Sequence, residues 1–150
     1  MATTAVKSVF VDTNVLIFAN VAEAPLHKVS LAKLQEYRES DCKIWISGQV
    51  LREYLAVRSR AELFKKASDL SILIDRVHFF ELDFNVVYDT PATMEKLLML
   101  LKRIDVAGKQ VHDANIVATM LVHGVKYLLT DNVEDFKRYS QFITVIPIRE

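Results

Sequence analysis

The sequence is poor in cysteine, glycine and proline. Of its 150 residues, one is cysteine, three are glycine and three are proline. The single cysteine, Cys42, excludes an internal disulfide and is typical of a reducing compartment. With 51% apolar and 25% charged residues, the chain is neither fibrous nor disordered in composition. Its length suits one compact domain over residues 1–150.

The chain also lacks an excess of charge of one sign, because nineteen basic residues balance nineteen acidic ones. This balance excludes the bulk positive field of many nucleic-acid-binding proteins, so any contact with nucleic acid requires a local basic patch. Two interpretations of the basic residues near Glu53 stay open, a track for an RNA backbone and an ordinary solvated face. These residues are Arg52, Arg58, Arg60, Lys65 and Lys66.

Long apolar runs are absent as well. The stretch VKSVFV near the start is too short for the core of a signal peptide, and Asp12 interrupts the apolar residues that follow. The longest apolar runs fall well below the length that spans a membrane. We therefore expect a cytoplasmic protein with no membrane segment.

What the sequence does contain is an alternation of short apolar runs and segments of helical periodicity. This alternation predicts an α/β fold with a central, mainly parallel sheet flanked by helices. Pro147 cannot donate to a sheet ladder, so the last strand is expected at an edge. The predicted strands cover residues 6–11, 43–47, 77–82, 125–130 and 143–148, and the predicted helices cover 13–20, 27–40, 48–57, 61–75, 93–104, 112–123 and 133–139.

Several carboxylates fall where predicted strands end or helices begin. In VFVDTNVLIFA (9–19), Asp12 stands between two apolar segments, where a lone charge is costly to bury. Asp131 follows a strand in the same way, Glu53 lies one turn into a helix, and Asp113 begins a largely apolar helix. Because sites in α/β sheets form at the carboxyl ends of strands, we expect these acids to converge and share a cation.

Oxygen ligands of this kind favour a hard cation, Mg²⁺ or Mn²⁺. The single cysteine and the unspaced histidines exclude a zinc site of the usual kind. The sequence contains no P-loop, no GxGxxG and no GxSxG. Acid clusters with divalent metals are typical of phosphodiester hydrolysis, where the metal activates water and stabilises charge on the phosphate.

Four segments in this order resemble the PIN domain, and within it the VapC-type toxins of prokaryotic toxin–antitoxin pairs. The segments are VDTNVLI, ISGQVLREY, VHDANIVAT and LLTDNVEDF, and the resemblance covers essentially the full chain. It implies a parallel sheet flanked by helices and an Mg²⁺- or Mn²⁺-dependent endoribonuclease that acts on RNA. It also implies a cognate antitoxin protein and a homodimer.

Carried over by position, the resemblance implies that Asp12, Glu53 and Asp113 are catalytic metal ligands. The fourth position departs from the pattern, because many relatives have Thr-x-Asp where this chain has Thr130 followed by Asp131 and Asn132. The fourth group is therefore open, as is the choice between one metal ion and two. Its candidates are Asp131, which we also expect to be catalytic, Asn132 and Asp135, and the residues expected to orient the ligands are Asn14 and Thr130.

The acids also have purely structural interpretations: each Asp can cap a helix or turn, a common use of Asp, and Glu53 can be a solvated helix residue or a member of an ion pair. For the whole chain, the main alternative is a non-catalytic PIN-fold module that binds RNA or protein. Such a module is expected to have lost one of the first three acids, and none is lost. A phosphatase of the haloacid-dehalogenase type needs a second Asp two residues after the first, and Asn14 stands there instead.

An apolar stripe on one predicted helix is a candidate for the homodimer contact. Leu63, Ala67, Leu70 and Ile74 recur at helical spacing. The alternative is that this stripe packs on the chain's own sheet, as helices of single domains usually do. Trp45, Phe79 and Phe80 are expected in the core rather than as platforms for nucleic-acid bases.

Overall fold

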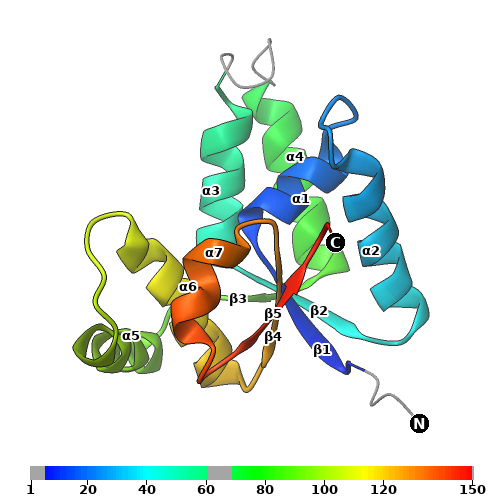
Figure 1. Ribbon diagram of the computed structural model, residues 1–150. Coiled ribbons are helices and arrows are strands. Elements are labelled where there is room, and N and C mark those ends of the chain that lie inside the picture. The colour runs from blue at the N-terminus through cyan, green and yellow to red at the C-terminus, as the bar shows by residue number, and fades with distance from the viewer. Residues whose placement is uncertain (1–5, 61–68, 150) are drawn as a thin grey trace, which may run out of the picture.

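The computed structural model describes residues 6–60 and 69–149, and it contains a five-stranded, all-parallel sheet in the order β3-β2-β1-β4-β5 (Figure 1). The predicted α/β architecture is thereby confirmed. The strands are β1 (Ser8–Val11), β2 (Lys43–Ser47), β3 (Asn85–Val87), β4 (Tyr127–Thr130) and β5 (Thr144–Pro147). The helices are α1 (Thr13–Asn20), α2 (His27–Glu39), α3 (Gly48–Arg58), α4 (Leu70–Asp83), α5 (Pro91–Arg103), α6 (Gln110–His123) and α7 (Val133–Phe136), with a 3₁₀ turn at Lys137–Tyr139.

The order of the strands places the carboxyl end of β1 at the middle of the sheet. From β1 the chain continues to β2 and β3 on one side, and it later returns to β4 and β5 on the other. The crevice of such a sheet opens where the strand order reverses, here between β1 and β4. Asp12 follows β1 at this point, and its backbone N–H donates to the Leu129 carbonyl of β4 (3.0 Å).

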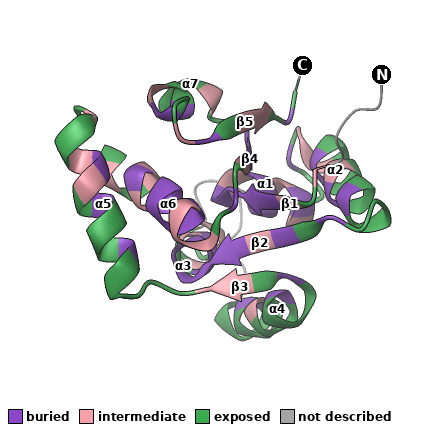
Figure 2. Ribbon diagram, turned by 90° about the horizontal axis from the view of Figure 1, so that it is seen from below, coloured by how far each residue is buried: buried purple, intermediate pink, exposed green. Residues whose placement is uncertain are grey.

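The helices gather in two groups, with α1 to α4 in the upper part of Figure 1 and α5 to α7 at the lower left. The middle of helix α6, from Ala114 to Met120, is mostly buried, whereas α5 exposes its outer face (Figure 2). The strands β1 and β4 are buried from their second residue onward, as expected for strands covered on both faces. Pro147 lies on the edge strand β5, which confirms that expectation.

The predicted strand at 77–82 is wrong, because these residues belong to α4. Aromatic and β-branched residues gave the segment its strand-like composition. Leu73, Val77 and Phe80 nevertheless recur at helical spacing and turn toward the core, and Phe84 after the helix is buried beside them. Phe80 is a core residue as expected, whereas Phe79 is 52% exposed, so its assignment to the core is wrong. The short strand β3 was not predicted.

The apolar stripe is only partly described, because Leu63 and Ala67 lie outside the described residues. Leu70 and Ile74 are 59% and 50% exposed, so neither packs fully on the sheet of its own chain. No helix in the described ranges combines the length and the apolar character needed to cross a bilayer.

Candidate metal centre

A cleft of about 620 Å³ opens at the carboxyl end of β1. It is bounded by α1, α3 and the start of α6, so residues distant in sequence meet there. Three of the predicted acids, Asp12, Glu53 and Asp113, contribute to it. The full lining is Asp12, Thr13, Asn14, Ile17, Gln49, Arg52, Glu53, Ala56, Val57, Arg60, Lys109, His112, Asp113 and Asn132.

Asp12 is almost fully buried, and neutral donors surround its carboxylate. Its Oδ1 accepts the backbone N–H of Thr13 (2.8 Å), which makes Asp12 the N-cap of α1. Its Oδ2 accepts Thr130 Oγ1 (2.8 Å) and Asn14 Nδ2 (3.1 Å). Burial raises the pKa of Asp12 from 3.8 to about 6, although these hydrogen bonds act in the opposite direction. The capping role is therefore real, but it leaves a buried acid that is still costly to ionise.

Glu53 projects from α3 and is fixed at both oxygens. Thr13 Oγ1 donates to its Oε2, and Gln49 Nε2 donates to its Oε1, each at 2.8 Å. Because Thr13 directly follows Asp12, the first of these bonds links Glu53 to the end of β1. Glu53 is thus held by two neutral donors, and neither neutralises its charge.

Asp113 lies in the first turn of α6 and is half-buried. Among the described residues, none donates a hydrogen bond to its carboxylate. Burial, together with the nearby charges of Asp12, Asp135 and Glu53, raises the pKa of Asp113 from 3.8 to about 6. The N-cap of α6 is Lys109, so Asp113 does not cap this helix. Asp113 is consequently a carboxylate without a partner in a field of other carboxylates.

This arrangement fits a hard divalent cation by the chemistry of its donors. The available ligands are carboxylate oxygens that converge on one cleft, and their mutual repulsion is relieved by positive charge. In the described ranges, no three His, Cys, Asp or Glu side chains stand close enough to form a ready-made coordination sphere.

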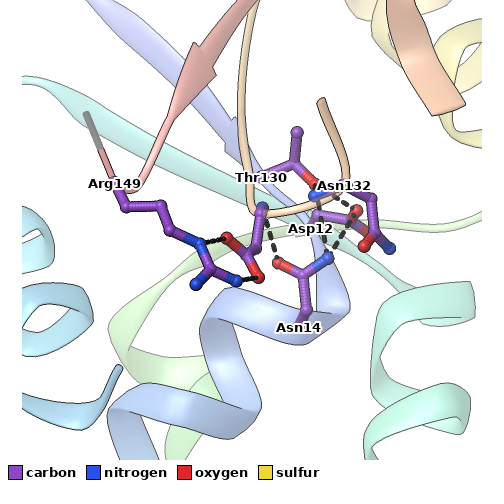
Figure 3. A network of polar contacts seen from close by, with 6 residues as sticks. Asp12, Asn14, Thr130, Asn132 and Arg149 are labelled. Atoms are coloured by element: carbon purple, nitrogen blue, oxygen red, sulfur yellow. Dashed lines mark hydrogen bonds and ion pairs between the residues drawn. The ribbon is translucent and has the colours of Figure 1, made fainter. Parts of the chain in front are cut away.

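The side chain of Asp131 forms an ion pair with Arg149 outside the cleft. Its carboxylate receives two hydrogen bonds from Arg149, Nε to Oδ1 at 2.9 Å and Nη2 to Oδ2 at 2.8 Å, and it is not among the residues that line the cleft. Figure 3 shows Arg149 on one side of Asn14 and Asp12 on the other. The backbone N–H of Asp131 donates to Asn14 Oδ1 (3.0 Å), so Asp131 contributes to the network through its main chain.

The other two candidates for the fourth group differ in position, because Asn132 is part of the cleft lining and Asp135 is not. The Asn132 backbone N–H donates to Thr130 Oγ1 (3.0 Å). Asp135 is near enough for its charge to act on the pKa of Asp113. Asn14 and Thr130, expected to orient the ligands, both donate to Asp12.

Gln49 was missed in the sequence, although it belongs to this site. It is 5% exposed and uses its whole amide group: Nε2 donates to Glu53 and to the His112 carbonyl (2.9 Å), and Oε1 accepts Asn115 Nδ2 (2.8 Å). Asn115 also donates to Asp89 (3.1 Å). Gln49 thereby connects α3 with α6 and fixes Glu53 relative to the turn that carries Asp113. Its position four residues before Glu53, on the same helical face, was the available signal.

Replacing Gln49 tests this connection. We expect Gln49→Met, which keeps the approximate volume but removes every hydrogen bond, to lower the free energy of unfolding by about 2 kcal/mol, because buried polar partners lose their bonds. Mn²⁺ affinity should fall about tenfold, as is typical when a partner that orients a metal ligand is removed. Denaturant unfolding and calorimetry measure the two effects. Gln35→Met, at an exposed position of α2, is the control; parental values for Gln49→Met would contradict the connection.

Comparison with known proteins gives a consistent picture of the fold. The chain matches the PIN domain over residues 9–141. It is similar to FitAcB from Neisseria gonorrhoeae (15% identity, TM-score 0.68, covering 93% of this chain and 97% of that one). It is also similar to VapC20 of Mycobacterium tuberculosis, a sarcin-ricin loop cleaving toxin (17% identity, TM-score 0.67, covering 93% of this chain and 98% of that one). A third similar structure is a toxin–antitoxin complex from Klebsiella pneumoniae (20% identity, TM-score 0.65, covering 95% of this chain and 98% of that one).

The search among curated proteins gives no match. The family match covers most of the chain, and it includes the ends of β1, β2 and β4 together with the turn of α6 that carries Asp113. The chain belongs to the PIN-domain family.

Proposed function

We propose that this protein is an endoribonuclease that depends on Mg²⁺ or Mn²⁺ and acts as the toxin of a toxin–antitoxin pair. The observation that carries the proposal is the half-buried carboxylate of Asp113, which has no hydrogen-bond donor among the described residues and faces the charges of other acids. An acid in this setting is stabilised by a bound cation. Similarity to a sarcin-ricin loop cleaving toxin and to toxin–antitoxin complexes supports the RNA substrate and the antitoxin partner.

In this proposal Asp12, Glu53 and Asp113 hold the divalent ion, and Asn132 and Asp135 complete its surroundings. When bound, the ion activates water and stabilises the charge that develops on the phosphate. Thr13 and Gln49 hold Glu53 in place, while Asn14 and Thr130 hold Asp12. Asp131, paired with Arg149, acts through its backbone rather than as a ligand.

Two further parts of the proposal concern location and assembly. We infer a cytoplasmic protein, where both RNA and a cognate antitoxin are available. The exposed Leu70 and Ile74 of α4 support a contact with a second copy of the chain. Sedimentation at micromolar concentration tests this contact, and a purely monomeric protein would count against a constitutive homodimer.

The function is tested by incubating the purified protein with end-labelled RNA. We expect cleavage with Mg²⁺ or Mn²⁺ and none in EDTA, because the carboxylates alone repel the phosphate. Asp113→Asn protein, purified in parallel, controls for contaminating nucleases. A folded protein that binds RNA but cleaves none with either ion would favour the rival function, a non-catalytic binding module.

A further inference from the structure

The rim of the cleft carries positive charge that the chain itself does not use. Arg52, Arg60 and Lys109 line the cleft and are exposed. Within the described part of the chain, none of their side chains forms a hydrogen bond or an ion pair. Exposed Lys and Arg often extend into water without a partner, so exposure alone indicates no ligand. Their common position around a cleft that contains carboxylates requires a further explanation.

The acids of the cleft do not pair with these cations, although ion pairing would be the simplest way to neutralise them. Asp12 and Glu53 take their hydrogen bonds from neutral groups, namely Thr13, Asn14, Thr130 and Gln49. The cation that lowers the pKa of Asp113 is Arg138, which does not line the cleft. The cleft therefore has a negative floor and a separate positive rim.

The rim cations stand on two walls. Arg52 belongs to α3 and Arg60 follows that helix, whereas Lys109 is the N-cap residue of α6. The two helices approach each other at the cleft, where Gln49 of α3 donates to the His112 carbonyl of α6 (Figure 1). The lining also includes apolar residues, Ile17 of α1 and Val57 of α3. A ligand that pairs with cations on both walls would carry more than one negative charge, and its less polar groups would meet these apolar side chains.

We propose that Arg52, Arg60 and Lys109 form a subsite for the backbone phosphates that flank the scissile phosphate of single-stranded RNA. This inference rests on the proposed function, because the floor acids and their divalent ion would engage the central phosphate. Sugars and bases would lie against the apolar lining residues Ile17 and Val57. A cleft of about 620 Å³ is of a size that takes a small ligand, which favours one or two nucleotides of a single strand over a duplex.

The salt dependence of RNA binding gives the subsite a measurable signature. Each phosphate contact with a single strand contributes about −0.7 to the slope of log affinity against log salt concentration, so three contacts give a slope of about −2. Affinity should then fall about 20-fold between about 50 and about 200 mM KCl. The combined variant R52Q/R60Q/K109Q should show a slope near zero. A suitable probe is a phosphorothioate-substituted single-stranded RNA, which resists hydrolysis, at constant Mg²⁺.

The matched control removes the same number of positive charges at the amino ends of the strands, opposite to the cleft. Lys7 and Lys126 directly precede β1 and β4, Lys43 begins β2, and all three side chains are exposed. Because the strands are parallel, these lysines lie away from the cleft. The variant K7Q/K43Q/K126Q has the same net charge as the rim variant, and it should keep the parental slope. Equal losses in both variants would indicate a general charge effect and overturn the subsite.

Two other results separate this inference from the function on which it rests. If the parent cleaves RNA and the rim variant retains the slope of about −2, the subsite is wrong and the nuclease stands. If the parent neither binds nor cleaves RNA, both are wrong. Mn²⁺ binding and the circular dichroism spectrum of the rim variant should match those of the parent, which ensures that a lost slope reports lost contacts. Equal affinity for the annealed duplex would contradict the assignment to a single strand.

Discussion

Asp12→Asn and Asp113→Asn should each reduce metal-dependent RNA cleavage by at least about 1,000-fold, equivalent to about 4 kcal/mol of transition-state stabilisation. Both side chains line the cleft, and each substitution removes a negative charge that would hold the proposed divalent ion. Single-turnover cleavage of end-labelled RNA at saturating protein measures the effect. Circular dichroism should show an intact fold for both variants.

Asp131→Asn provides the contrast within the same site. The carboxylate of Asp131 is paired with Arg149, whereas its link to Asn14 runs through the backbone. The substitution therefore leaves that backbone link available, and we expect a loss of less than about tenfold, or about 1.4 kcal/mol. Asp75→Asn, at an exposed position of α4, is the control for a general charge effect. A loss for Asp131→Asn as large as that for Asp113→Asn would restore Asp131 as a catalytic ligand.

The second large effect concerns the thermal stability of the parent and of Asp113→Asn, whose order should reverse when metal is added. In EDTA at pH 7.5, Asp113→Asn should be more stable than the parent by a few degrees, because it removes a charge that burial and other acids disfavour. With free Mn²⁺ about 100-fold above its dissociation constant, the parent should gain about 2.7 kcal/mol, which corresponds to about 5–10 °C in Tm. The variant should gain little, so the order of the two melting temperatures reverses.

The pH dependence of the metal-free protein provides a further check on the same charge. The folded-state pKa of Asp113 is about 6, above its ordinary value of 3.8, so the folded state binds the extra proton between these two values. Stability from this group is present at low pH and is lost as the pH rises through about 6. The advantage of Asp113→Asn in EDTA should thus shrink below pH 6 and vanish below about pH 4. A difference independent of pH would show that the substitution acts by some other route.

Much of the site could be predicted because sequence order and sheet topology agree. Asp12 follows β1, Asp131 follows β4, and Glu53 lies in the helix after β2. In a parallel sheet the carboxyl ends of the strands lie together, so the topology alone predicts that these segments meet. Residues 77–82 have the composition of a strand but the periodicity of a helix. Leu73 and Phe80 have the spacing of one helical face and are both buried, and the segment is helical.

The hydrogen-bond partners of the site could not be predicted in the same way. Gln49 meets the His112 carbonyl and Asn115 across more than sixty residues of sequence, and only the packing of α3 near α6 brings them together. The pairing of Asp131 with Arg149 depends on where the chain passes after β5. Topology predicted that Asp131 would lie near the site, but the direction of its side chain depends on this pairing.

Mn²⁺ binding to the metal-free protein, measured by electron paramagnetic resonance without RNA, is the decisive test of a divalent-cation site formed by Asp12, Glu53 and Asp113. We expect saturable binding to the parent, loss of that binding in Asp113→Asn, and parental binding in Asp131→Asn. A parent that binds no Mn²⁺, or an Asp113→Asn variant that binds it as tightly as the parent, would contradict the proposed site.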